Sequence, residues 1–287
     1  MPEETRGNGS STTNTTTTKP PVDLSSLQGK GVLVTGGATG PGAALVRALA
    51  DAGAYVTIAD DNAIAGQRLM LDLINTNKRA QYTYTRLPSF PSQAESFHHA
   101  SSFSPTTTLS LVVANVIPAS PPPPSDPLLA WLTTADPAAT PPPAPSTASL
   151  DVGVTAALYT AHLAFHHFRA SAKNDDDDDE DAGRRGGHLL FLAPRAYVVD
   201  GGVGPDALAA GAAAAGFRSV VRALRAVTAR KGKGGAAGVV EGVRVNLVAV
   251  EAEGGVAVQG REDRSTRGEE GTDEKERKDG NEEEVKL

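Results

Sequence analysis

The stretch that most constrains the fold is VLVTGGATGPGAALVRALADAGAYVTIADD, residues 32–61. It opens with a short apolar run, passes through a turn that holds Gly36, Gly40 and Gly42, and continues with helical periodicity into a second β-branched run that ends at Asp60. A strand, a glycine-rich turn, a helix and a second strand in this order are typical of a βαβ unit. The stretch therefore predicts a parallel sheet whose first turn can approach a phosphate group.

The same alternation of β-branched runs and helical patterns continues along the chain. Further strands are expected at 80–85, 109–115, 187–193 and 240–250, and helices at 42–52, 62–75, 92–102, 149–172 and 206–229. Strands that alternate with helices predict parallel strands joined by right-handed crossovers. The predicted fold class is α/β, a doubly wound parallel sheet of about six strands.

The formal net charge of −7 arises from two acidic tracts. The run DDDDDED at 175–181 carries −7, and 261–287 carries 7 Lys/Arg against 11 Asp/Glu, or −4, so the rest of the chain sums to +4. Blocks of like charge are typical of solvated, disordered chain, so the acidity identifies no binding partner. The expected organisation is a Thr/Ser-rich tail at 1–26, a folded domain at 27–258 with a Pro-rich loop at 118–147 and an acidic loop at 174–186, and a charged tail at 259–287.

Several chemistries are excluded or disfavoured by composition. The chain has no cysteine, which excludes disulfides and thiolate catalysis. It has no signal-peptide pattern and no apolar run of membrane-spanning length, so we expect a soluble cytoplasmic protein without a membrane partner. The basic sequence at 230–235 lacks interleaved aromatic residues, which disfavours nucleic-acid binding. His162 and His166 lie one helical turn apart without a visible third ligand, so we expect a helix surface and no metal site.

The glycine turn and Asp60 predict a dinucleotide site. Glycines at 36, 40 and 42 allow a tight turn and a close approach of the backbone to a pyrophosphate, whose charge is stabilised by the helix N-terminus. Asp60 follows Gly42 by 18 residues, where a carboxylate accepts hydrogen bonds from a ribose and repels a 2′-phosphate. The expected cofactor is therefore NAD, with NADP disfavoured.

The spacing Thr35-Gly36-x-x-x-Gly40-x-Gly42 resembles that of the short-chain dehydrogenase/reductase family, and the likeness is greatest to fungal members. The segments LQGKGVLVTGG, VVAN, DVGVTAALYTAHLAF and VRVNLVAV are similar to family landmarks, over about residues 27–250. The resemblance implies a Rossmann-type domain and an NAD(P)-dependent oxidoreductase acting on a small alcohol or ketone. It implies these cofactor-binding residues: Thr35, Gly36, Gly40, Gly42, Asp60 and Asn115.

The family's catalytic Asn-Ser-Tyr-Lys tetrad is not recognisable in this chain. Aligning the family landmarks places these residues at the four positions: Gly153, Pro194, Ala210 and Ala214. No tyrosine follows Tyr197, and no lysine lies between Lys173 and Lys231. Tyr197 comes only three residues after Pro194, where the family needs about a dozen, so we expect it not to take the place of the catalytic tyrosine.

Other family features near the nicotinamide also differ. The family's Asn-Ala-Gly reads Asn115-Val116-Ile117, and its later Pro-Gly reads Val250-Glu251. Arg86 replaces an Asp that contacts adenine in the family. The highly charged tail replaces a final helix and strand, so the sixth strand is expected to be an exposed edge.

Three hypotheses remain open. The chain is an oxidoreductase that uses an unrecognised acid/base, for which Tyr159 and His162 are the candidates, or it is a non-catalytic member that binds a dinucleotide or a protein partner. The third is a decayed gene product, which the homopolymeric tracts and the unusual C-terminal sequence would suit. For the first two, helices 149–172 and 206–229 are the expected surfaces of a homo-oligomer.

Overall fold

The computed structural model of the 287-residue chain describes residues 24–117, 147–173, 186–198, 208–229, 243–250 and 256–258. Its strands are β1 (Gly31–Thr35), β2 (Tyr55–Asp60), β3 (Arg79–Tyr84), β4 (Leu109–Asn115), β5 (His188–Pro194), β6 (Arg244–Val250) and β7 (Val256–Val258). Its helices are α1 (Gly40–Asp51), α2 (Ala63–Asn75), α3 (Phe90–Phe103), α5 (Ala148–Leu150), α6 (Ala156–Lys173), α7 (Arg195–Val198) and α8 (Leu208–Ala229), with a 3₁₀ turn η1 (Ser25–Leu27) and a π-helical turn η2 (Asp151–Thr155).

The strands form one sheet in the order β3-β2-β1-β4-β5-β6-β7. Neighbours from β3 to β6 are parallel, and β7 pairs antiparallel with β6. The direction of winding reverses between β1 and β4, and such a switch point leaves a crevice at the carboxyl ends of the strands. The predicted doubly wound α/β fold is confirmed.

The local sequence explains why these elements form. The central strands are continuous Val, Leu, Ile and Ala runs because helices cover both faces, and every residue of β1 is buried. Pro41 lies in the first turn of α1, where no N–H is needed, and the Asn62 side chain caps α2 by accepting the Ala65 N–H at 3.1 Å.

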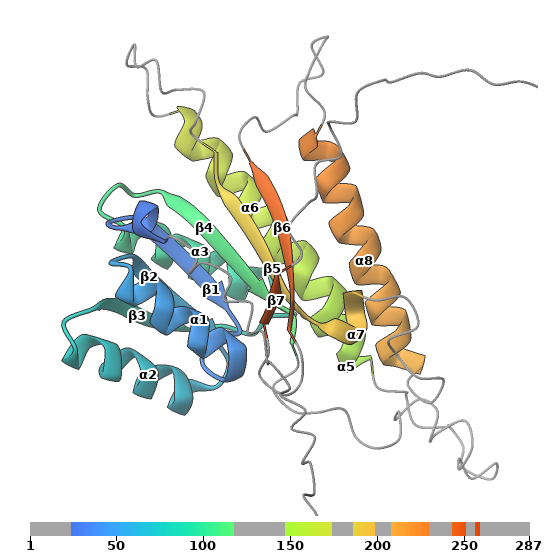
Figure 1. Ribbon diagram of the computed structural model, residues 1–287, viewed down its shortest axis with the longest axis horizontal. Helices are drawn as coiled ribbons and strands as arrows, with labels where there is room; N and C mark the ends of the chain where they lie inside the picture. The colour runs from blue at the N-terminus through green and yellow to red at the C-terminus, as the bar shows by residue number, and fades with distance from the viewer. Residues whose placement is uncertain are drawn as a thin grey trace, which may run out of the picture.

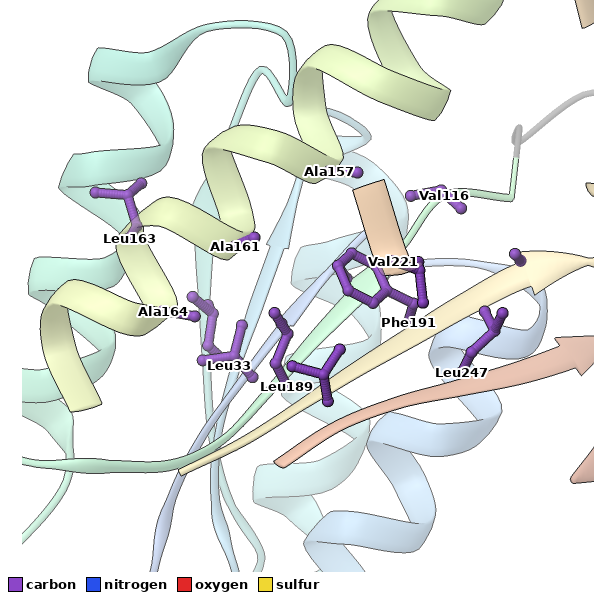
Figure 2. Packing of buried hydrophobic residues seen from close by; sticks show 14 of the residues in the cluster. Leu33, Val116, Ala157, Ala161, Leu163, Ala164, Leu189, Phe191, Val221 and Leu247 are labelled. Carbon is purple, nitrogen blue, oxygen red and sulfur yellow. The ribbon is translucent and has the colours of Figure 1, made fainter. Parts of the chain in front are cut away.

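Helices cover the sheet on both faces, with α1 and α2 on one side and α3, α6 and α8 on the other (Figure 1). Each layer has its own apolar cluster. Figure 2 shows the second of them, where Ala161 and Ala164 of α6 face the sheet near Leu33 and Leu189. Alanine on the inner face lets α6 lie close to the strands. The carboxyl ends of the strands, where the glycine turn lies, are therefore supported by a closely packed core.

The structure differs from the expected elements in three places. The helix expected at 149–172 is divided into α5, η2 and α6, and α7 was not expected. The expectation that the sixth strand is an exposed edge is wrong along its second half, because β7 pairs Val258 with Val248 and Val256 with Val250. A strand of three residues gives almost no periodicity in the sequence, but its apolar segment can extend the sheet by backbone hydrogen bonds.

The expected tails and loops at 1–26, 118–147, 174–186 and 259–287 lie outside the described residues, apart from a few border positions. Among the helices of the described ranges, none is both long and apolar enough to cross a membrane.

Candidate functional site

The glycine turn lies between β1 and α1, at the switch point of the sheet. Gly36 and Gly40 have φ values of +62° and +53°, a region that favours glycine. A Cβ at Gly42 would overlap the carbonyl oxygen of Gly36 and lie 2.9 Å from Nδ2 of Asn115. Glycine at position 42 is therefore required by the close approach of the two ends of the turn.

Asn115, the last residue of β4, fastens this turn from the neighbouring strand. Its Nδ2 donates to the Gly36 carbonyl oxygen at 2.8 Å, and its Oδ1 accepts the Ile117 N–H at 3.1 Å. The N–H of Gly36 donates to the Ala59 carbonyl oxygen at 2.8 Å. The side chain of Asn115 thus contacts the turn that would hold the ligand, and its role in cofactor binding stays a prediction.

Asp60 binds the turn from the other side. Its Oδ2 accepts the Ala38 N–H and its Oδ1 accepts the Asn62 N–H, each at 2.9 Å, and the residue is 8% exposed. The Tyr82 hydroxyl donates to the main-chain carbonyl of Asp60 at 2.8 Å. Burial, followed by the nearby Asp60 carboxylate, raises the pKa of Asp61, so two acidic groups lie together at this corner.

The N-terminus of α1 lies at the same carboxyl ends of the strands. Thr39, the N-cap residue, makes no side-chain hydrogen bond to the first turn of the helix. The first N–H groups of a helix and its dipole attract an anion. The turn and α1 therefore supply the donors and the positive end that a pyrophosphate requires.

Thr35, which the resemblance implies as a cofactor-binding residue, is the last residue of β1. It is 3% exposed, and its hydroxyl donates to the Val113 carbonyl oxygen of β4 at 3.2 Å. This hydroxyl joins two strands within the sheet. Thr35 therefore holds the end of β1, from which the glycine turn starts, against β4.

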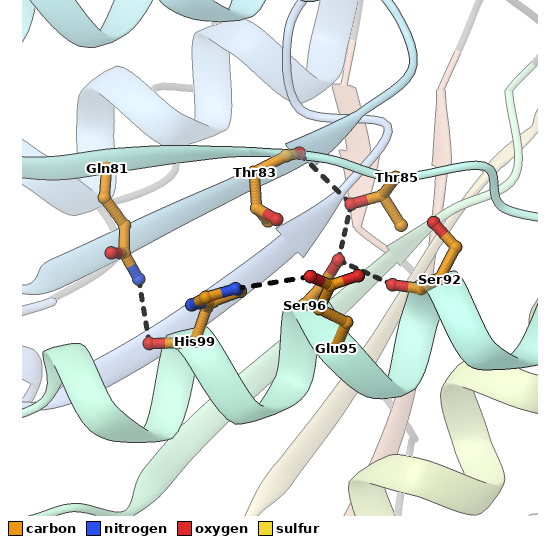
Figure 3. A network of polar contacts seen from close by, with 7 residues as sticks. All are labelled: Gln81, Thr83, Thr85, Ser92, Glu95, Ser96 and His99. Carbon is orange, nitrogen blue, oxygen red and sulfur yellow. Dashed lines mark hydrogen bonds and ion pairs between the residues drawn. The ribbon is translucent and has the colours of Figure 1, made fainter.

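The outer rim of the site is formed by the end of β3 and the start of α3 (Figure 3). The Thr85 hydroxyl lies 2.6 Å from the Ser96 hydroxyl, and Ser96 donates to the Ser92 carbonyl oxygen at 2.9 Å. The Ser92 hydroxyl accepts the Arg86 N–H at 3.0 Å. These bonds fix the backbone at Arg86, whose side chain is exposed.

The residues at the four tetrad positions that the resemblance implies lie on three elements. Gly153 is in η2, Pro194 ends β5, and Ala210 and Ala214 are in α8. A Cβ at Gly153 would lie 3.2 Å from Cβ of Ala213 and 3.2 Å from the Tyr197 ring, a contact tighter than most. Small and apolar groups therefore occupy the four positions, and at Gly153 the neighbours leave little room for a larger side chain.

Tyr197 lies near these positions, on α7 and not on α8. Its ring reaches the Cβ position of Gly153 and packs 6.3 Å from the Phe217 ring. Within the described residues its hydroxyl has no hydrogen-bond partner. Burial raises the pKa of Tyr197, which keeps the hydroxyl protonated.

The alternative acid/base candidates lie on the outer side of α6. The ring of Tyr159 is 5.3 Å from that of Phe90, and His162 is 5.9 Å from the same ring. His166 is exposed and contacts the His167 ring. In the described part of the chain, no three His, Cys, Asp or Glu residues gather to hold a metal ion.

Two curated fungal proteins are similar to this chain. The 5'-hydroxyaverantin dehydrogenase of Dothistroma septosporum is 39% identical over 151 residues, which are 52% of this chain and 48% of that protein. The 5'-hydroxyaverantin dehydrogenase stcG of Emericella nidulans is 32% identical over 148 residues, 51% of this chain and 47% of that protein. The chain thus spans about half the length of these relatives. No protein-family model matches the chain.

Two solved structures have a similar fold. The apo form of LigO from Sphingobium sp. strain SYK-6 matches 79% of this chain and 69% of its own, with a TM-score of 0.57 and 17% identity. The structure of gox2181 matches 78% of this chain and 72% of its own, with a TM-score of 0.54 and 19% identity. At these identities the matches support the fold.

Proposed function

We propose that this chain, which belongs with the short-chain dehydrogenases/reductases by its fungal relatives and its fold, binds NAD in preference to NADP and transfers hydride slowly or not at all. The observation that carries the proposal is the contrast between two sets of residues near the carboxyl ends of the strands. The glycine turn, Asn115 and Asp60 form a complete hydrogen-bonded unit, whereas the tetrad positions hold Gly, Pro and Ala.

Binding is supported by the charges and donors at the turn. The N-terminus of α1 favours the pyrophosphate, and the carboxylate of Asp60 can accept the ribose hydroxyls with its remaining lone pairs. A 2′-phosphate would meet both Asp60 and Asp61, and like charges at short range are strongly unfavourable. NAD is therefore the expected ligand.

Slow turnover follows from the missing proton donor. A positioned general acid/base contributes about a hundred- to ten-thousand-fold in rate. The residual rate would depend on holding the two reactants close together. Groups that act as one unit are not lost additively, so replacing all four leaves little for a single substitution to restore.

The competing proposal is an active dehydrogenase of a small alcohol or ketone. It is favoured by the names of the two relatives, and 5'-hydroxyaverantin is the substrate to test first. A decayed gene product, the third hypothesis, would bind no dinucleotide.

Calorimetric titration tests binding. We expect NAD to bind the wild-type chain with a Kd at least about tenfold below that of NADP. Asp60→Ala should weaken NAD binding about tenfold or more, whereas the control Asp72→Asn should not, because Asp72 is exposed and forms only a 3.9 Å pair with Arg47. Absence of heat with both dinucleotides would contradict the proposal.

Turnover is measured by NADH fluorescence with 5'-hydroxyaverantin and a panel of small secondary alcohols. We expect a rate at least about a hundredfold below the usual enzyme range of 1 to 10³ per second. A rate within that range would show that another group replaces the tetrad, and the variants Tyr159→Phe and His162→Gln would then identify it.

The outer faces of α6 and α8 are the proposed surfaces of a homo-oligomer. Leu158 of α6 is 46% exposed and Val227 of α8 is 47% exposed. Leu158→Glu should shift the sedimentation coefficient toward that of a monomer if these faces meet. From the sequence pattern we also propose a cytoplasmic location.

A further inference from the structure

The segment that follows β3 lies beside Asp60 at the carboxyl ends of the strands. The pairing of β2 with β3 ends at Asp60 and Tyr84, and the next N–H, that of Thr85, donates to the Asp60 carbonyl oxygen at 3.0 Å. Residues 85–87 therefore leave the sheet next to the carboxylate that the proposed function gives to the ligand. The position of this segment affects the main chain of Asp60.

Side chains of α3 hold this segment in place. The Ser96 hydroxyl lies 2.6 Å from the Thr85 hydroxyl (Figure 3). Two residues further along the segment, the Leu87 carbonyl oxygen accepts a hydrogen bond from Nε2 of Gln93 at 2.6 Å. The segment is thus fixed to α3 at both of its ends.

The same amide of Gln93 also bonds to α6. Its Nε2 donates to the carbonyl oxygen of Ala156, the first residue of α6, at 3.2 Å, and its Oε1 accepts the Thr160 hydroxyl at 2.8 Å. Ala156 directly follows η2, the turn that contains Gly153. One side chain therefore joins the segment beside Asp60 to the start of α6.

This network is buried and its amide is fully paired. Gln93 is 0% exposed and Thr160 is 1% exposed. Both amide hydrogens and the amide oxygen of Gln93 have partners, so its burial leaves none of these groups unpaired. An apolar side chain of similar length would remove all three bonds and take this donor from two carbonyl oxygens. A satisfied buried network favours one arrangement of the groups that it joins.

We propose that Gln93 is a positioning residue of the dinucleotide site. Its amide keeps residues 85–87 and the start of α6 in one arrangement, so a ligand does not have to order the groups beside Asp60 when it binds. A role confined to stability would lower the free energy of unfolding and leave the affinity of the folded chain unchanged. This role rests on the proposed function, because both place the dinucleotide beside Asp60.

Two glutamine-to-methionine variants of the full chain separate these roles. Gln93→Met removes the three bonds and keeps an unbranched side chain of similar length. Gln81→Met is the matched control, because Gln81 in the first half of β3 also bonds to α3. Its Nε2 donates to the Thr57 hydroxyl at 2.8 Å and to the His99 carbonyl oxygen at 2.9 Å (Figure 3).

Calorimetry with NAD gives the deciding measurement, and urea unfolding checks that each variant is folded. We expect Gln93→Met to raise the Kd for NAD about tenfold and Gln81→Met to change it by less than about twofold. Equal Kd values for the two variants would overturn the positioning role and leave the proposed function intact. If the wild-type chain binds no dinucleotide, both fail.

Thr160→Val is the second variant, and it decides the question if Gln93→Met does not fold. It keeps the shape of the side chain and removes the hydroxyl that Oε1 of Gln93 accepts, so we expect a several-fold rise in the Kd for NAD. Hydrogen exchange without ligand should be faster than in the wild type at residues 85–87 and at the start of α6. Unchanged exchange at both segments would overturn the positioning role.

Discussion

Both carboxylate oxygens of Asp60 accept backbone N–H groups, one from Ala38 in the glycine turn and one from Asn62. A carboxylate offers about four lone-pair sites, so two remain for ribose hydroxyls. The same side chain can therefore set the shape of the turn and select the ligand. The orientation of Asp60 depends in turn on Tyr82, whose ring packs on Gly66 so closely that a Cβ there would overlap it.

Tyr82→Phe isolates this dependence. It keeps the ring and removes the 2.8 Å hydrogen bond to the Asp60 carbonyl oxygen. We expect a loss of about 1 kcal/mol in the free energy of unfolding and a several-fold rise in the Kd for NAD. Tyr84→Phe is the matched control, because Tyr84 is 55% exposed, and it should change neither quantity. Equal effects of the two variants on urea unfolding and calorimetry would argue against a positioning role.

At the scale of elements, α8 carries small apolar residues on its buried side. Ala213, Ala214 and Phe217 are buried in the apolar cluster, where Ala213 lies beside Gly153 of η2 and the Phe217 ring contacts those of Phe191 and Tyr197. Ala212 and Ala215 are exposed. Alanine is the best helix former, so the exposed positions cost the helix nothing. Ala214, where the resemblance implies the family's lysine, lies in the apolar core.

A pair of lysine substitutions tests this assignment. Ala214→Lys would put a charged chain where the present residue is 1% exposed, and we expect a loss of at least about 2 kcal/mol in the free energy of unfolding. Ala215→Lys, one residue later on the exposed side, should stay within about 0.5 kcal/mol of the wild type. If urea unfolding shows that Ala214→Lys is tolerated equally well, the position has room for the family's lysine.

At the scale of the whole molecule, two partly buried histidines make the stability of the fold depend on pH. His167 of α6 lies 5.3 Å from the Phe97 ring of α3, and His188 begins β5. Burial lowers the pKa of both below the ordinary value of 6.5. The neighbours His166 and His98 add to the effect at His167, and Arg244 adds to it at His188. The unfolded chain therefore binds more protons than the folded one just below pH 6.5.

This linkage predicts a loss of stability on acidification. The contribution of the two neutral histidines should be fully present above about pH 7 and decrease as the pH falls below 6.5. Thermal unfolding at several pH values measures it as a falling Tm. The double variant His167→Gln and His188→Gln should flatten the profile in this range. An unchanged slope would assign the effect to other groups.

Much of the fold could be predicted because its signals are local. The glycine turn and the spacing to Asp60 predicted a helix at 42–52 and a second strand that ends at Asp60, close to the observed α1 and β2. Short elements gave weaker signals, so α7 and β7 were missed, and η2 was read as regular helix. The tetrad positions Gly153, Pro194, Ala210 and Ala214 followed from a resemblance and stay a prediction.

The sequence by itself determined the order of the main strands and helices, the glycine turn and the absence of a Tyr-x-x-x-Lys pair, because each depends on residues close together in the chain. Only the tertiary structure decided that the Asp60 carboxylate is shared between the glycine turn and the start of α2, that the Thr35 hydroxyl bonds to β4, and that Tyr197 fills the space beside Gly153. Those contacts join residues from different elements. Their partners are chosen by the packing of the layers, which no local pattern specifies.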